Sequence, residues 1–214
     1  MIETHTIPTL DHFGVSEHAV RQVLAAALEK GGDFADLFFE HTQNHSLSLR
    51  DRAVNATYAS IDYGVGIRVL AGNQTGYAYV ESTGLQDMLK AARTAARIAA
   101  SGSPGIPANL SWKESTVRRY PVLQPWDAIT VHQRIPFVQR LNDAIFALDP
   151  RVDKVIVSLS DSTSRVVYVN SQGLVCGDYR PMLSLSATCI MTENGVYENG
   201  RASRSYRAGF EYLT

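Results

Sequence analysis

The apolar positions of the chain change period several times, and each change predicts where a helix gives way to strands. Between residues 16 and 30, apolar residues recur three and four positions apart, the spacing of one helix face. Ser16 is a suitable N-cap for this helix, and Gly31-Gly32 a suitable end. Thr83-x-x-Gln86 and Thr130-x-x-Gln133 have the form of capping boxes. They predict two further helices, one from residue 83 that ends before the segment 101–110, and one from residue 130 to about 148.

Between these helices the apolar period falls to two, which is the period of a β-strand. Residues 35–51 predict two strands joined by a turn near Gln43-Asn44. Residues 63–82 predict a hairpin around Gly72-Asn73-Gln74, because these residues tolerate the positive φ of a tight turn. After Pro150, residues 152–170 predict another pair of strands around a polar turn at Asp161-Ser162-Thr163.

The C-terminal segment predicts further strands with a turn at Asn194-Gly195. We expect the last strand to run from Ser203 to Tyr212. Period two would then place Tyr206, Phe210 and Tyr212 on one strand face. Such a face is suited to another copy of the chain, so we expect self-association as a dimer through these strands.

These elements predict an α+β fold, a mostly antiparallel β-sheet with about three helices packed on it. The order of elements in residues 16–82 recurs in residues 130–206, which suggests two duplicated helix-plus-four-strand units. The Gly- and Pro-rich segment 101–110 is the best internal boundary. We therefore expect one α+β unit in residues 1–110 and a second in 111–214.

Composition and charge exclude several classes of protein. The chain has 214 residues, 45% of them hydrophobic and 19% charged, with a net charge of −1. This is the composition of a globular protein and not of a disordered chain, and the charge does not favour nucleic-acid binding. No segment has the ~20 apolar residues of a membrane helix. The N-terminal sequence lacks the features of a signal peptide and the chain has only two cysteines, so we expect a cytoplasmic location.

His41 and His45 are the most obvious candidate metal ligands. A His-x-x-x-His spacing brings two rings together on a helix, but four residues of a strand cover ~13 Å. Residue 42 is Thr, where a metallopeptidase helix would carry Glu. We interpret both as surface or turn histidines without a metal.

Other residues that can carry chemistry have plainer interpretations as well. Gly64 and Gly66 precede a strand and not a helix, so we expect a bend or bulge and not a phosphate-binding loop. Asp178 and Arg180 share a strand face, which predicts an ion pair and leaves a substrate contact as the alternative. We interpret Cys176 and Cys189 as buried thiols and not as a redox pair or metal ligands, and the carboxylates Asp33 and Asp36 as caps or turns. The basic residues Arg201, Arg204 and Arg207 predict a solvated face or an interface with an acidic partner, with phosphate binding as the alternative.

Four segments, in this order, resemble the TldD/PmbA family of predicted zinc metallopeptidases, also described as modulators of DNA gyrase. They are ADLFFE (35–40), YGVGIRVLAGNQTGYAYV (63–80), YVNSQGLVCGDYRPMLSLS (168–186) and YRAGFEY (206–212). The resemblance covers residues 16–213. Arg180-Pro181 and the GFEY of residues 209–212 are more similar to the TldD branch than to the PmbA (TldE) branch.

The resemblance implies that this chain corresponds to the N-terminal domain of a longer protein. The zinc ligands of the family, a His-Glu-x-x-x-His helix and a later Cys, belong to a C-terminal half that is absent here. No His-Glu dipeptide occurs in the chain, so no catalytic or metal residue can be assigned, and the substrate-binding residues are unknown. We expect the chain alone to bind no zinc and to hydrolyse no peptide.

The resemblance also implies a role and partners. The expected role is to enclose peptides or unfolded proteins for proteolysis, as a homodimer or with a TldE/PmbA-like partner. The alternative is a non-catalytic protein-interaction module of the gyrase-modulator type. We expect neither nucleic acid nor a membrane as a partner.

Overall fold

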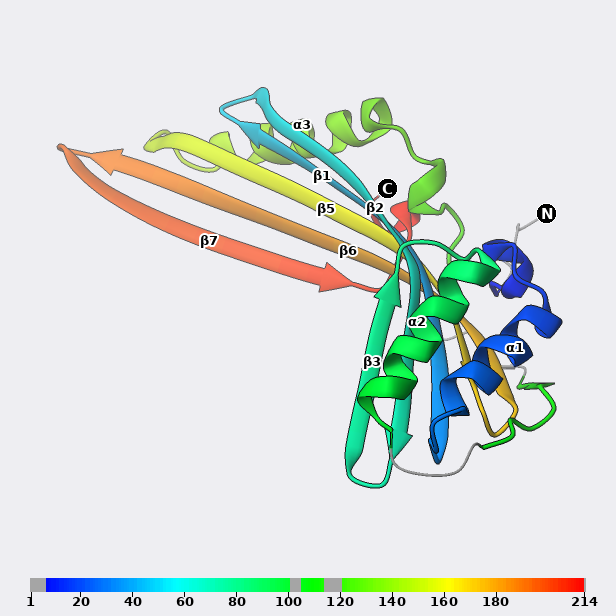
Figure 1. Cartoon of the computed structure of the whole chain (residues 1–214). Coiled ribbons are helices and arrows are strands. Elements are labelled where there is room, and N and C mark those ends of the chain that lie inside the picture. The colour runs from blue at the N-terminus through cyan, green and yellow to red at the C-terminus, as the bar shows by residue number, and fades with distance from the viewer. Residues whose placement is uncertain (1–6, 101–104, 114–120, 214) are drawn as a thin grey trace.

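The computed structural model describes residues 7–100, 105–113 and 121–213, which form three α-helices and a seven-stranded sheet (Figure 1). The helices are α1 (Glu17–Leu28), α2 (Leu85–Ile98) and α3 (Val131–Phe146), with short 3-10 helices η1 (Leu10–Phe13), η2 (Trp126–Ala128) and η3 (Phe210–Leu213). The strands are β1 (Phe34–Arg50), β2 (Ala53–Ala71), β3 (Gln74–Val80), β4 (Ser111–Trp112), β5 (Val152–Asn170), β6 (Leu174–Glu193) and β7 (Val196–Tyr206). None of the helices described is long and apolar enough to cross a membrane.

The sheet has the order β3-β2-β1-β5-β6-β4, and β7 pairs with the later part of β6. All pairings are antiparallel except the short β4–β6 pair. The central strands β1, β2, β5 and β6 are long and the sheet curls along them, so that it has two arms (Figure 1). The first arm lies under α1 and α2 and includes β3 and β4. The second arm lies beside α3 and includes β7. The predicted α+β class is confirmed.

Each arm has its own hydrophobic core on the same face of the sheet. In the first arm, Leu24 and Met88 from the helices pack with Leu37 and Ile67 from the strands. In the second arm, Trp126 and Val138 pack on strand residues that include Leu47, Leu49, Val157 and Leu159. We call the face that carries both cores the helix face. Because side chains alternate along a strand, the intervening residues of β1, β5 and β6 point to the opposite face.

The two halves of the chain share a strand order but contain fewer strands than predicted. Each half has a helix followed by a three-stranded antiparallel meander, α1-β1-β2-β3 and α3-β5-β6-β7. The first strands of the two meanders, β1 and β5, pair at the centre of the sheet, and the later strands follow outward on either side. Among the residues described, 1–110 therefore contain three strands and not four, and 111–214 contain four only when the two-residue β4 is counted.

Two predicted turns are wrong for a common reason. Gln43-Asn44 lies inside β1 and Asp161-Ser162-Thr163 lies inside β5, and the two segments pair with each other in the sheet. These polar residues occupy the stretch between the two hydrophobic cores, where no buried apolar side chain is required. Sequence alone cannot separate this situation from a turn. The turns at Gly72-Asn73 and Asn194-Gly195 are confirmed.

The predicted helix starts are confirmed for α1 and α3 but not for α2. Ser16 accepts a hydrogen bond from the Ala19 N–H, and the Gln133 side chain accepts one from the Thr130 N–H. The N-cap of α2 is Gly84, since the Thr83 hydroxyl instead donates to the Phe13 carbonyl.

The predicted C-terminal strand is also wrong, because β7 ends at Tyr206 and the chain then forms η3. Phe210 is half-buried, with its ring centroid 5.7 Å from that of Trp126, whose indole N–H donates to the Ala208 carbonyl. The aromatic residues therefore do not share an exposed strand face, and the stated basis for self-association is removed.

Candidate functional site

The two hydrophobic cores leave a polar stretch between them on the helix face, and its histidines have separate partners. His41 of β1 and His12 of η1 lie with Nδ1 and Nε2 3.0 Å apart. Arg165 of β5, which forms an ion pair with Asp127, is close enough to act on both rings. Partial burial and the charge of Arg165 lower the pKa of both histidines, and His12 is lowered further by His41.

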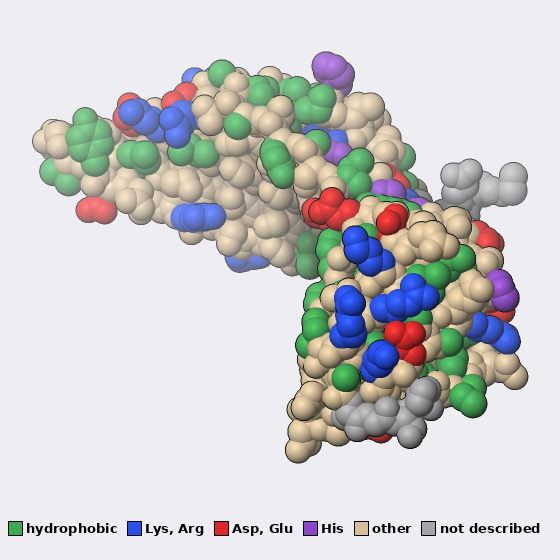
Figure 2. Space-filling model, in the orientation of Figure 1, with side chains coloured by type: hydrophobic (Ala, Val, Ile, Leu, Met, Phe, Trp, Pro, Cys, Tyr) green, Lys and Arg blue, Asp and Glu red, His purple; other side chains and the backbone are tan. Residues whose placement is uncertain are grey.

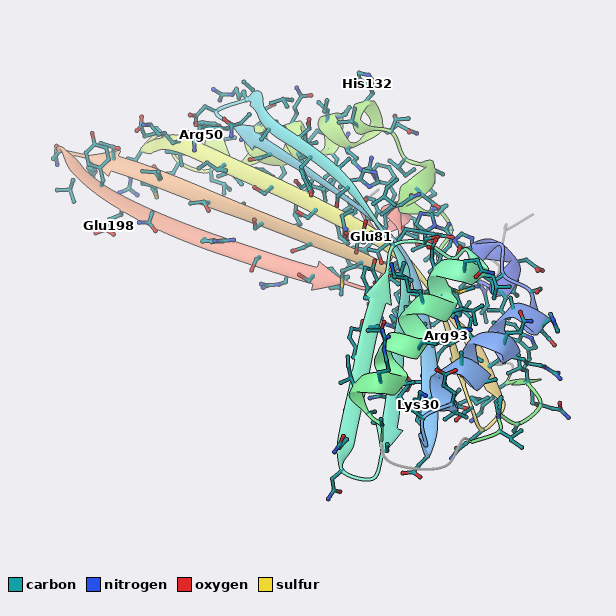
Figure 3. The ribbon with its side chains drawn as sticks, viewed as in Figure 1. Lys30, Arg50, Glu81, Arg93, His132 and Glu198 are labelled. Carbon is teal, nitrogen blue, oxygen red and sulfur yellow. The ribbon has the colours of Figure 1, made fainter. Side chains whose placement is uncertain are left out.

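This histidine pair predicts that stability falls in mild acid. The unfolded chain takes up a proton near pH 6.5, whereas the folded pKa of His41 is lower, so protonation favours unfolding as the pH falls through this interval. We expect the urea midpoint to decrease from pH 7.5 to 5.5, and His41→Gln to reduce that decrease. The control is His132→Gln, an exposed position on α3 (Figure 3). Equal slopes for the wild-type and His41→Gln proteins would contradict the assignment.

His45 lies further along β1 and contacts a buried carboxylate. Its Nδ1 is 3.1 Å from Asp161 of β5, which also receives two hydrogen bonds from Arg134 of α3, at 2.9 and 3.0 Å. Burial raises the pKa of the Asp161 carboxyl, and the charges of Arg134 and His45 oppose that rise. Arg134 also donates to the carbonyls of Trp126 and Ile129. This network attaches α3 to the sheet.

His41 and His45 lie within β1 and not in a turn, and both are half-buried. They do not meet: one contacts His12 and the other Asp161. Across the described residues, no group of three or more His, Cys, Asp or Glu side chains could hold a metal ion. The two cysteines form no disulfide, and burial raises the pKa of Cys176.

Gly64 and Gly66 accommodate tyrosines of the neighbouring strand. A Cβ at Gly64 would lie 2.7 Å from the Tyr79 hydroxyl, and a Cβ at Gly66 would lie 2.6 Å from the Tyr77 hydroxyl. Both glycines pair regularly with β1, so the predicted bend or bulge is wrong. No helix begins after them, so they do not form a phosphate-binding loop.

The charged candidates form local ion pairs. Arg180 donates to Asp178 at 2.6 Å, as the spacing predicted. Asp33 accepts from the Gly72 N–H and so fixes a turn. Asp36 does not cap a turn, because it is buried and paired with Arg68. Arg201 and Arg204 point to opposite faces of β7, so the predicted basic cluster is not a single patch.

The sheet face opposite the helices carries a continuous set of hydroxyl side chains that sequence analysis did not identify. Ser46, Ser160, Ser184 and Ser205 are neighbours across β1, β5, β6 and β7, and so are Ser48, Ser158, Ser186 and Ser203. Asn44 lies between Ser60 and Ser162, and Thr42 lies beside Ser164. We call these residues the serine face. The signal in the sequence is an S-x-S alternation that occurs in β1, β5, β6 and β7.

Charged residues border the serine face but do not enter its centre. Asp62 and Arg180 lie in the row of Thr42, and Arg50 and Arg201 lie in the row beyond Ser48. The curl of the sheet leaves a pocket of about 240 Å³ on the serine face. It is lined by Asn44, His45, Ser46, Tyr58, Ser160, Asp161, Ser162, Met182 and Ser184, of which His45 and Asp161 contact each other on the helix face. A hydroxyl both donates and accepts hydrogen bonds, so this surface can bind uncharged polar groups of either kind.

Sequence comparisons place both halves of the chain in one family. Residues 35–99 match the PmbA/TldA metallopeptidase domain 1, and residues 124–214 match the PmbA/TldA metallopeptidase central domain. A metalloprotease TldD homolog of Haemophilus influenzae is 29% identical over 182 residues, which are 85% of this chain and 38% of that protein. A metalloprotease TldD homolog of Buchnera aphidicola (subspecies Acyrthosiphon pisum) is 24% identical over 85% of this chain and 37% of its own length.

Solved structures agree with the fold. A protein of Bacteroides thetaiotaomicron described as a modulator of DNA gyrase superposes with a TM-score of 0.70 and 14% identity, over 90% of this chain and 45% of its own. TldE of Thermococcus kodakarensis superposes with a TM-score of 0.62 and 16% identity, over 88% of this chain and 43% of its own. The chain thus spans less than half of the length of each of these relatives. It belongs to the PmbA/TldD family, of which it carries the N-terminal and central domains.

Proposed function

We propose that this chain is the substrate-enclosing and dimer-forming part of a TldD-like zinc metallopeptidase that degrades peptides or unfolded proteins. Its relatives named metalloprotease TldD homolog support the peptidase class. The likeness to TldE supports a partner of that kind. The cytoplasmic location belongs to the same proposal.

The serine face is the observation that carries this proposal. Serine is not a strong strand former, so many serines on one face of a sheet need a reason beyond strand formation. An apolar face would promote aggregation, and a charged face would favour ligands of the opposite charge. Hydroxyls avoid both problems and can bind the N–H and C=O groups of any polypeptide. Such a surface suits an enclosure that accepts peptides of varied sequence.

The zinc ion that the family implies does not fit the residues that the structure describes. A catalytic zinc site uses three protein ligands, and no such set exists among the residues described. We therefore assign the metal and its chemistry to residues outside this chain. The part played by this chain is to bind and confine the substrate.

The test is peptide hydrolysis by a zinc-loaded longer protein that contains this chain. We expect Ser160→Asp combined with Ser184→Asp to raise KM for a neutral peptide by about tenfold, with a smaller change in kcat, because the charges remove uniform binding. Ala202→Asp is the matched control, since Ala202 is exposed and points to the helix face of β7, outside the serine face. Unchanged KM in the double variant would contradict the proposed role.

The alternative is an interaction module of the gyrase-modulator type. It is supported by the description of structural relatives as modulators of DNA gyrase. This alternative predicts no peptide hydrolysis by the longer protein, with or without zinc. Zinc-dependent hydrolysis in the same assay would exclude it.

A further inference from the structure

β2 has a long edge that no other strand of the described chain covers. β1 pairs with β2 from Ala53 to Leu70, but on the other side β3 pairs only with Val65–Ala71. Residues 53–62 therefore have a free edge, and nearly all of them are exposed. The unpaired N–H and C=O groups along a strand edge can form hydrogen bonds with another extended chain. Another strand is the ligand whose own N–H and C=O groups repeat at the same spacing.

This edge carries few of the features that protect other edges: a register shift against β1 leaves Asn55 unpaired near the Arg50 end, and the pairing from Ala56 to Asp62 is regular. Natural sheets block their edges with charged residues, proline or bulges. β7 forms another long edge and carries Glu198, Arg201 and Arg204. Residues 53–61 of β2 read AVNATYASI, without a charge or a proline, and expose Tyr58 and Ile61 by 62% and 66%. β2 thus remains open to strand addition where β7 is protected.

Charged residues at the two ends of the free edge indicate the direction in which an added peptide strand would run. Glu40, Asp62 and Glu81 lie close enough to Tyr79 that, after burial, their charges raise its pKa. They lie where the free edge meets β3, and acidic side chains gather where the two arms meet (Figure 2). Arg50, paired with Ala53, lies at the other end (Figure 3). A chain antiparallel to β2 would begin beside the carboxylates and end beside Arg50.

We infer that residues 53–62 of β2 bind an extended peptide as an added antiparallel strand, with its free amino terminus at Glu40, Asp62 and Glu81. The inference rests on the proposed function and names the site at which an uncharged peptide substrate is held. The carboxyl terminus of a peptide of about ten residues lies toward Arg50, since each residue advances about 3.3 Å. The side chains on one face of this strand lie next to Tyr58 and Ser60, at the border of the serine face.

The binding experiment uses the 214-residue chain and a ten-residue peptide of Thr, Ser and Val with free termini and a fluorophore on a central side chain. We expect a saturable rise in anisotropy and slower amide exchange in residues 53–62. N-methylation of alternate peptide residues separates strand addition from side-chain contact. One of the two alternate sets should abolish binding and the other should not, because only one edge of the peptide faces β2.

The orientation is tested with the same peptide acetylated at its amino terminus. We expect acetylation to weaken binding by up to about fivefold, the upper end of the range for exposed charge pairs. Asp62→Asn should weaken binding of the free peptide and leave the acetylated peptide unchanged. Glu198→Gln on β7 is the matched control, at an exposed carboxylate on another edge (Figure 3). Equal binding of the free and acetylated peptides would overturn the assigned orientation.

Two results would overturn the site itself. One is exchange protection on β3 or β7 in place of 53–62. The other is protection of 53–62 that increases with protein concentration without peptide, which would make a second copy the occupant. Failure here is distinguishable from failure of the proposed function. A longer protein that hydrolyses peptides while 53–62 stays unprotected retains the function and loses this site.

Discussion

Replacing Arg134 with methionine is expected to lower the free energy of unfolding by about 3–5 kcal/mol, because it leaves the carboxylate of Asp161 buried without its main counter-ion. Asp161 and Arg134 are each only 4% exposed. The guanidinium makes two hydrogen bonds to the carboxylate and also donates to the carbonyls of Trp126 and Ile129, which precede α3. His45 remains beside Asp161 but is partly exposed. Urea unfolding at pH 7 measures the change.

Two variants separate loss of the ion pair from loss of packing. Arg140→Met lies on the exposed side of the same helix and should change stability by less than about 0.5 kcal/mol. Arg134→Met combined with Asp161→Leu removes both charges and should recover most of the lost stability, because no unpaired charge remains buried. A loss below about 1 kcal/mol in the single variant would show that water or His45 already compensates Asp161.

The sequence predicted those parts of the fold that depend on local periodicity. The three helices, and the hairpins at Gly72-Asn73 and Asn194-Gly195, follow from apolar spacing and turn residues. It could not predict that β1 and β5 continue through polar segments. The polar segments lie between the part of the sheet covered by α1 and α2 and the part covered by α3. Which part of the sheet each helix covers is decided by tertiary packing and not by local sequence. The sequence likewise could not predict that Phe210 turns back against Trp126, because the contact spans many residues.

The candidate site was missed because each of its residues is ordinary by itself. A single serine carries no distinctive chemistry, unlike a metal ligand, an activated nucleophile or a pair of carboxylates. The S-x-S alternation becomes informative only when strand register aligns Ser46, Ser160 and Ser184 in one row. The register of β1 against β5 joins residues more than one hundred positions apart, and no local pattern encodes it. The resemblance to the PmbA/TldD family could be seen in the sequence because each family motif is a contiguous segment and does not depend on how the strands pair.

Leu24→Ala in α1 is expected to destabilise both arms together, by about 2–5 kcal/mol. Leu24 is fully buried in the core of the first arm. That core also contains Val167, Val169 and Val175 from the second half of the sequence, and the other core contains Leu47 and Leu49 from the first half. Neither residues 1–110 nor residues 111–214 therefore hold a complete core of their own.

The sheet provides the coupling between the arms. β1 and β5 pair without interruption from Asp36 with Asn170 to Arg50 with Ile156, so the strands under α1 continue to those under α3. Amide exchange in α3 should accelerate in Leu24→Ala as much as exchange in α1. Leu159→Ala, at a fully buried position of the second core, is the reciprocal variant and should accelerate α1 in turn. If Leu24→Ala instead leaves α3 protected and unfolding occurs in two steps, the two arms are separate folding units that share strands without sharing stability.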